Sequence, residues 1–107
     1  MSGTFGDMGN LLKQAQEMQK HLEQAREELR KATVEGSAGG GAVRATVSGE
    51  GLLTRIAIQP QLVAGGDAKL IEETVLAAVR DGISKAAVMR EERLARISGG
   101  LSLPGLF

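Results

Sequence analysis

The sequence predicts an α+β fold in which one long helix, three antiparallel strands and a second long helix follow one another in a single domain of 107 residues. Three observations support this prediction. Apolar residues recur every three or four positions from residue 8 to residue 32, which is the period of a helix. The runs 42–48 and 52–59 alternate apolar and polar residues on either side of a glycine-containing turn, as the strands of a hairpin do. A second helical pattern follows Asp67 and continues to about residue 97.

The first helix carries an apolar stripe at the a and d positions of a heptad repeat. The stripe consists of Met8, Leu11, Ala15, Met18, Leu22, Ala25, Leu29 and Ala32. Asp7 is placed to cap this helix, and residues 1–7 are expected to form a flexible tail. A stripe this narrow is suited to meeting one other helix, either the second helix of the same chain or a helix of a partner.

Three strands are expected between the helices. Residues 33–35 are a short strand candidate, and the glycine-rich segment 36–41 is expected to be a flexible connection. Pro60 closes the third strand because it has no backbone N–H to donate, and residues 61–66 are expected to form a loop.

Alternation assigns one face to each of the later two strands. Side chains two positions apart in a strand point to the same side of the sheet. Those expected to share a face are Val43, Ala45 and Val47 in one strand, and Thr54, Ile56 and Ile58 in the other.

The second helix is expected to begin after Asp67, which is a good N-cap, and to cover the sheet. Its sheet-facing positions are Ile71, Val75, Ala78, Val79, Ile83, Ala86 and Ala87. A glycine inside a helix, such as Gly82, lowers helix stability by about 1 kcal/mol relative to alanine. Close packing of the helix against the sheet would explain a glycine at this position. Residues 98–100, Ser-Gly-Gly, are expected to end the helix, and residues 98–107 to form a flexible tail.

Composition favours a homodimer. Much of the 42% hydrophobic share is alanine, the only aromatic residues are Phe5 and Phe107, and fifteen glycines raise the entropy lost on folding. A thin core of this kind is often supplemented by oligomerisation, and the edges of the sheet need a partner or protection. The candidates for the dimer interface are Leu22, Leu29, Val43, Ala45, Val47, Ile56 and Ile58.

The residues present argue against catalysis. The chain has no cysteine and a single histidine, His21, so no disulfide, no metal site, no cofactor and no catalytic triad are expected. The segment 36–41 lacks the Gly-Lys-Ser/Thr that completes a phosphate loop. No small-molecule substrate is therefore expected. The absence of a long apolar run and of a signal sequence predicts a cytoplasmic protein that does not enter a membrane.

The charges are balanced, with 13 basic and 13 acidic residues. Residues 85–96 contain four basic and two acidic side chains, which fits either a solvated face laced with ion pairs or contacts to phosphate. Nucleic-acid affinity comes largely from phosphate contacts, so any positive surface must arise by segregation of charge in the fold. The lack of aromatic residues disfavours binding to single strands.

Several segments, in order, resemble the YbaB/EbfC family of nucleoid-associated DNA-binding proteins. They are residues 8–16 with Met18 and Gln19, residues 34–36, the glycine-rich loop, residues 43–49, Ile56, Ile58, Pro60 and Leu62, Ala77 and Ala78, residues 98–101 and residues 103–105. The similarity covers nearly the whole chain.

The resemblance implies a bacterial homodimer whose first helices project like the arms of tweezers and which binds duplex DNA in the nucleoid, with an influence on gene expression. It implies no enzyme activity and no cofactor. Carried over by position, the candidates for DNA contact are Lys13, Lys20, Arg26, Arg30, Lys31, Arg90, Arg93 and Arg96. The arm departs from a purely basic surface because it also carries Glu17, Glu23, Glu27 and Glu28. The alternative is a non-enzymatic adaptor that binds other proteins through the heptad stripe or the apolar C-terminal tail.

Overall fold

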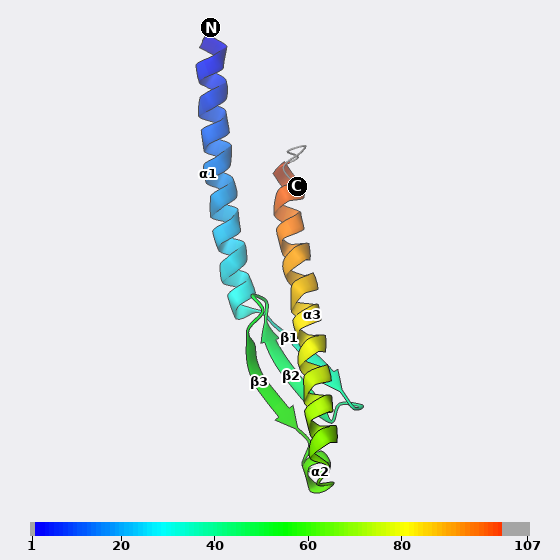
Figure 1. Ribbon diagram of the computed structural model, residues 1–107. Helices are drawn as coiled ribbons and strands as arrows, with labels where there is room; N and C mark the ends of the chain where they lie inside the picture. Colours follow the sequence, from blue (N-terminus) through cyan, green and yellow to red (C-terminus); the bar gives the residue numbers. More distant parts are fainter. Residues whose placement is uncertain (1, 102–107) are drawn as a thin grey trace.

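The computed structural model describes residues 2–101, with side chains for residues 8–97. The elements in chain order are α1 (Ser2–Lys31), β1 (Thr33–Ala38), β2 (Val43–Ser48), β3 (Leu53–Ile58), α2 (Pro60–Ala64) and α3 (Ala68–Leu101). The strands form one antiparallel sheet in the order β1-β2-β3. α3 covers one face of this sheet, and α1 rises beside the upper part of α3 (Figure 1). The predicted α+β order is confirmed.

The molecule is a long rod. Its principal extents are 77 × 23 × 16 Å and its radius of gyration is 21.0 Å, whereas a compact domain of this length has a radius of gyration of about 13 Å. The sheet occupies one end, and α1 projects past the end of α3 at the other (Figure 1). None of the helices between residues 2 and 101 is long and apolar enough to cross a membrane.

A contact between two glycines sets the distance between α3 and the sheet. A Cβ atom added to Gly36 of β1 would lie 2.1 Å from the backbone nitrogen of Gly82 and 2.3 Å from the carbonyl oxygen of Ala78. A Cβ atom on Gly82 would lie 2.8 Å from Cγ2 of Val47. Such separations are far inside van der Waals contact, so both positions require glycine. Close packing is therefore the reason for a glycine in the middle of α3.

The core beneath α3 is made of small side chains. Val43, Ala45 and Val47 of β2 and Ala78 and Ala86 of α3 have no exposed surface. Ile83, which was expected to face the sheet, is 47% exposed. At about 100° per residue, Ile83 lies on the opposite side of α3 from Asp81 and Lys85, whose side chains bond to β1.

The heptad stripe of α1 has a packed half and an open half. Ala25 and Leu29 are buried where α1 meets α3 and the sheet. The backbone N–H of Gly49, in the β2–β3 turn, donates to the carbonyl oxygen of Ala32 (2.9 Å), which fixes the end of α1. Met8 and Leu11, in contrast, are about three-fifths exposed. The expectation of packing against the second helix is met by the half of α1 nearest the sheet.

A β-bulge changes the expected face of β3. The register shifts at Thr46/Val47, so that Thr46 pairs with Arg55 and Val47 with Leu53. Thr54 is the extra residue, and its hydroxyl donates to the carbonyl oxygen of Thr46 (3.2 Å). Leu53, and not Thr54 as predicted, therefore shares the α3-side face with Ile56 and Ile58.

Both long helices extend beyond their predicted ends. α1 begins at Ser2 instead of after Asp7, and α3 continues through residues 98–100 to Leu101. Extending an existing helix requires no new nucleation, and glycine weakens a helix without removing a hydrogen bond as proline does. Residues 2–7 and 98–101, expected as tails, are thus helical. Met1 and residues 102–107 of the predicted tails lie outside the described residues.

Two shorter segments also differ from expectation. β1 includes residues 36–38, which were expected to be a flexible connection, because Gly36 and Ala38 pair with β2. Residues 60–64 form the short helix α2 instead of a loop, since Pro60 stands at the first helical position, where its missing N–H costs nothing. The predicted cap of α3 is confirmed: Oδ1 of Asp67 accepts from the N–H of Leu70 (3.1 Å).

Side chains of α3 close the outer edge of β1. The N–H of Ser37 donates to Oδ2 of Asp81 (3.0 Å), and Nζ of Lys85 donates to the carbonyl oxygen of Glu35 (3.2 Å). Lys85 also pairs with Asp81 at 3.0 Å. The Ser37 N–H, and secondarily Lys85, hold the pKa of Asp81 below its ordinary value of 3.8. These bonds occupy backbone groups that would otherwise be open to another strand.

We expect Gly36→Ala to lower the free energy of unfolding by about 3 kcal/mol, because the methyl group must push the backbones of β1 and α3 apart. Gly9→Ala is the matched control, since a Cβ atom there meets nothing within 4 Å and alanine favours a helix by up to about 1 kcal/mol. Urea denaturation of both variants tests this. Equal stability of the two would show that the close approach is not a constraint.

We expect Asp81→Asn to destabilise the fold at neutral pH and to lose this effect in acid. A carboxyl group whose pKa is lower in the folded state contributes stability above its unfolded pKa, and this is lost as the pH falls through the folded pKa. The difference in unfolding free energy between wild type and variant should therefore shrink below pH 3.8. Denaturation curves at several pH values measure it, and a difference independent of pH would contradict the prediction.

Candidate nucleic-acid interface

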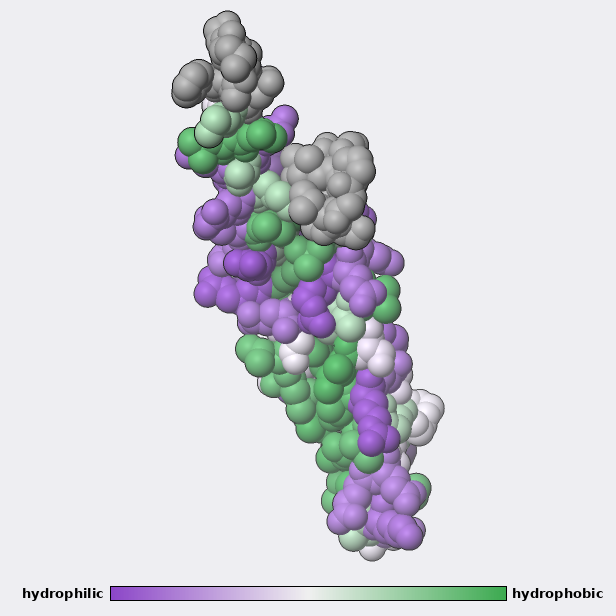
Figure 2. Space-filling model, turned by 45° about the horizontal axis from the view of Figure 1, so that its top comes forward, coloured by the Kyte–Doolittle hydropathy of each residue, from purple (hydrophilic) through white to green (hydrophobic). Residues whose placement is uncertain are grey.

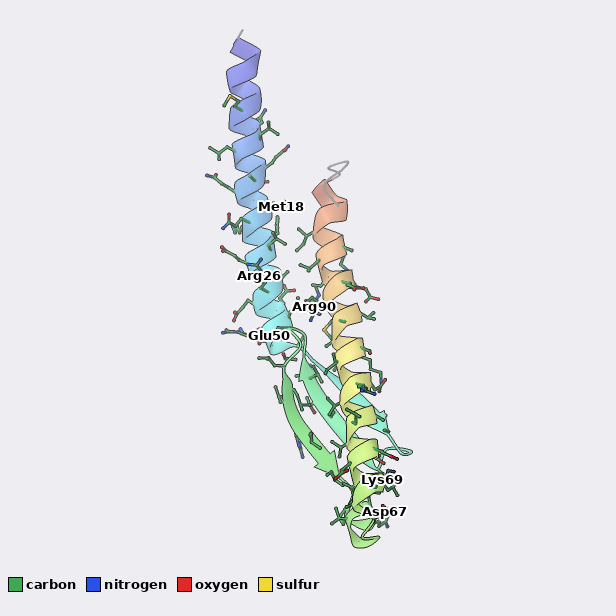
Figure 3. All side chains as sticks on the ribbon, in the orientation of Figure 1. Met18, Arg26, Glu50, Asp67, Lys69 and Arg90 are labelled. Carbon is green, nitrogen blue, oxygen red and sulfur yellow. The ribbon has the colours of Figure 1, made fainter. Side chains whose placement is uncertain are left out.

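The facing sides of α1 and α3 enclose a groove with two hollows. The hollow on the β3 side has a volume of about 380 Å³. Its walls are Leu22, Arg26 and Leu29 of α1, Glu50 of the β2–β3 turn, and Arg90 and Leu94 of α3. Figure 3 shows Arg26 and Arg90 on the two helices, with Glu50 near the base. The fold thus brings together two cations that are far apart in the sequence.

The two arginines of this hollow are held differently. Arg90 is half-buried, and its Nη1 donates to the carbonyl oxygen of Gly49 (3.5 Å). Arg26 is exposed, and within the described side chains neither it nor Arg90 forms an ion pair. Both guanidinium groups therefore keep donors for an anion.

The second hollow lies on the other side of the groove and has a volume of about 260 Å³. It is lined by His21, Gln24, Ala25, Glu28, Arg93, Arg96 and Ile97. Nη1 of Arg93 pairs with Oε2 of Glu28 at 2.5 Å, which links α3 to α1. Arg96 forms no ion pair with any described side chain. Of the two arginines, Arg96 is the one whose charge is not already balanced.

The remaining candidates lie on the exposed sides of α1. Arg30 and Lys31 both pair with Glu27. Oε1 of Glu27 lies 2.6 Å from Nη2 of Arg30 and 3.4 Å from Nζ of Lys31. The hydrogen bond from Arg30, with smaller contributions from Lys31, holds the pKa of Glu27 below its ordinary value. Lys13 and Lys20 are exposed and, among the described residues, have no acidic partner within ion-pair distance.

The eight predicted DNA-contact residues therefore fall into two groups. Arg30, Lys31 and Arg93 are neutralised by glutamates. The others make no ion pair in the described part of the chain: Lys13, Lys20, Arg26, Arg90 and Arg96. The position of Glu50 at the base of the groove was not anticipated, because it depends on where the β2–β3 turn meets α1. No sequence signal marks it.

The predicted dimer-interface residues also fall into two groups, buried and exposed. Val43, Ala45 and Val47 have no exposed surface, and Leu29 is 3% exposed, so α3 and the sheet already cover these side chains. Leu22 is half-buried in the groove. Only Ile56 and Ile58 present a substantial open face, at 41% and 37% exposure.

A group of exposed aliphatic side chains, here called the sheet patch, contains these two isoleucines. It consists of Leu53, Ile56 and Ile58 of β3 with Leu76 and Ile83, which lie on the side of α3 turned away from β1. Figure 2 shows a broad hydrophobic area over this end of the molecule. α3 packs mainly on β1 and β2, which leaves the face of β3 uncovered.

Two long helices that rise from a three-stranded antiparallel sheet define an α+β protein, and the groove between these helices brings arginines of both together. In the part of the chain with described side chains, no three His, Asp or Glu residues gather in a way that would hold a metal ion. Residues 5–101 match the YbaB/EbfC DNA-binding family, and the chain belongs to this family. The resemblance identified from the sequence is confirmed.

Relatives and a solved structure agree with this assignment. The chain is 42% identical to a nucleoid-associated protein of Acetivibrio thermocellus, over 98% of this chain and 94% of that one. It is 43% identical to a nucleoid-associated protein of Thermoanaerobacter pseudethanolicus, over 94% and 91%. The crystal structure of an uncharacterized Helicobacter pylori protein superposes with a TM-score of 0.71 at 24% identity, covering 87% of this chain and 95% of that one. This last likeness supports the fold.

Proposed function

We propose that this protein binds duplex DNA as a homodimer, mainly through phosphate contacts, and that it acts on the bacterial nucleoid in the cytoplasm without catalysing a reaction. Its influence on gene expression would follow from where and how tightly it binds. Membership of a DNA-binding family and the names of its relatives support the DNA part of the proposal. The observation that supports phosphate contacts is the group of cations on α1 and α3 that form no ion pair in the described part of the chain: Lys13, Lys20, Arg26, Arg90 and Arg96.

The groove supplies a physical reason for phosphate binding. Arg26 and Arg90 reach it from opposite helices, and Arg96 lies in the adjoining hollow. Guanidinium groups form short, charge-assisted hydrogen bonds to phosphate oxygens, and each neutralised phosphate releases counterions. The hydrogen bond from Arg90 to Gly49 already restrains that side chain, so less entropy is lost on binding. Phosphate contacts carry no direct sequence information, so binding through them should show no strong sequence preference.

The sheet patch and the open edge of β3 support the homodimer. Five large aliphatic side chains stay between 37% and 49% exposed, and full burial of such a side chain is worth about 1.5–3 kcal/mol. The edge of β1 is bonded by α3, whereas no described side chain bonds the outer edge of β3. A second copy placed against β3 and the adjacent side of α3 would cover both features. It would leave the ends of α1 projecting as arms.

The adaptor alternative has one observation in its favour, which is the exposure of Met8, Leu11 and Leu12 at the projecting end of α1. A titration with generic duplex DNA at low salt separates the two functions. Absence of binding at micromolar dimer would favour the adaptor.

We expect the triple variant Arg26→Gln, Arg90→Gln, Arg96→Gln to weaken duplex binding. Its plot of log affinity against log salt should become less steep by about 1 for each phosphate that is no longer neutralised. The matched control neutralises Arg55, Lys69 and Arg80, which are exposed, form no ion pair in the described part and lie outside the groove. Fluorescence anisotropy at several salt concentrations measures both slopes. An equal reduction in both triple variants would show that binding depends on net charge and not on the groove.

We expect Ile56→Glu to convert the dimer to an 11.2 kDa monomer, because a charge would be buried against the same surface of the second copy. Val88→Glu is the control, since Val88 is 53% exposed but lies outside the sheet patch. Light scattering gives the mass, and circular dichroism confirms that the helices remain. A dimer that survives Ile56→Glu would place the interface elsewhere.

A further inference from the structure

The second hollow of the groove contains the only histidine of the chain, which the proposed function does not use. His21 lies on α1 and lines this hollow together with Arg93 and Arg96 of α3. Its side chain is exposed. Among the described side chains, no hydrogen bond or ion pair involves His21. The imidazole ring is therefore available to a group that enters the hollow.

The polar side chains around His21 are mostly hydrogen-bond donors. Arg96 is exposed, forms no ion pair with any described side chain and reaches the hollow from the opposite helix. Gln24, one turn along α1 from His21, adds an amide. The one carboxylate of the lining, Glu28, is already paired with Arg93. The hollow thus combines donors from two helices with an acidic group whose charge is matched, which is an environment suited to an anion.

We propose that protonated His21 joins Arg96 in binding a phosphate group of the DNA, so that duplex affinity increases as the pH falls. This inference rests on the proposed function and adds to it a further contact residue and a response to pH. A protonated imidazole donates from both ring nitrogens, whereas the neutral ring donates from one. DNA phosphates keep their negative charge throughout the neutral range, so they favour the protonated ring. By linkage, a ring that takes up a proton on binding makes binding stronger in acid.

The charges near the ring explain why DNA would change its protonation. They lie on both helices: Glu17 and Glu28 on α1, and Glu92, Arg93 and Arg96 on α3. The two guanidinium groups disfavour a third cation in the free protein, whereas Glu17, one turn from His21, and Glu28 favour it. A phosphate that enters between the cations offsets their mutual repulsion. Proton uptake by His21 should therefore accompany binding.

The first test compares duplex affinity at about pH 7.5 and about pH 6, at constant salt. Histidine is the one side chain whose ordinary pKa lies in this range, and His21 is the only histidine. The affinity of the wild type should rise about threefold or more as the pH falls. His21→Gln should bind equally at both pH values, because an amide is not protonated there. Fluorescence anisotropy measures each affinity.

Two further variants make this test specific to a cation at position 21. His21→Lys carries its charge at both pH values, so it should bind more tightly than His21→Gln and show no pH dependence. The matched control is the double variant His21→Gln, Gln61→His. It moves the histidine to an exposed position of α2, at the end of the molecule opposite to this hollow (Figure 1). A pH dependence equal to that of the wild type in this control, or none in the wild type, overturns the proposal.

The second test follows the imidazole ring itself by NMR. At about pH 7, addition of duplex DNA should move the C–H signals of His21 toward the positions that they have in acid, since the ring takes up a proton. Signals that stay in place while anisotropy shows binding would mean that the DNA function stands and that the role of His21 is wrong. If the wild type binds no duplex at either pH, the proposed function itself fails, and this inference fails with it.

Discussion

The contact between Gly36 and Gly82 is the constraint on which the rest of the structure depends. Without Cβ atoms the backbones of β1 and α3 come so close that an added methyl group would lie 2.1 Å from the backbone nitrogen of α3. At that spacing the space between helix and sheet accepts mainly valine, alanine and glycine, and these are the residues buried there. Because α3 is drawn toward β1, it cannot also cover β3. The same contact thus produces the thin core and the uncovered sheet patch.

The position of α3 also explains how a chain without net charge presents cations. α3 and α1 leave the sheet in the same direction and share a groove (Figure 1). Glu27 is paired with Arg30 and Lys31 on the exposed side of α1, and Glu28 is paired with Arg93 of α3. These two acidic residues of the arm therefore act within the protein. Arg26, Arg90 and Arg96 form no ion pair within the described side chains, although Glu50 lines the same hollow as Arg26 and Arg90.

Local sequence patterns predicted the order of the helices and strands. The predictions that failed concern features that depend on tertiary contacts. Alternation correctly grouped Val43, Ala45 and Val47, since side-chain direction in a strand is a local property. It could not show that α3 of the same chain buries them. Their contribution to a dimer interface stays a prediction. Thr54 was misplaced because a bulge depends on the partner strand. The basic candidates could be located, but which of them were paired depended on Glu27 and Glu28.

α1 illustrates how one sequence pattern can meet two different environments. The apolar stripe is continuous from Met8 to Ala32, and its period does not change along the helix. What changes is the neighbour: Ala25 and Leu29 are buried where α1 meets α3 and the sheet, whereas Met8 and Leu11 are about three-fifths exposed. Apolar residues at a and d positions supply the tendency to pair, whereas flanking charges select the partner. Near the sheet, Arg93 of α3 matches Glu28, so the flanking charges select a helix of the same chain as the partner. The same helical pattern therefore gives a buried seam where α3 packs against it and an exposed apolar face where α1 projects past the end of α3 (Figure 1).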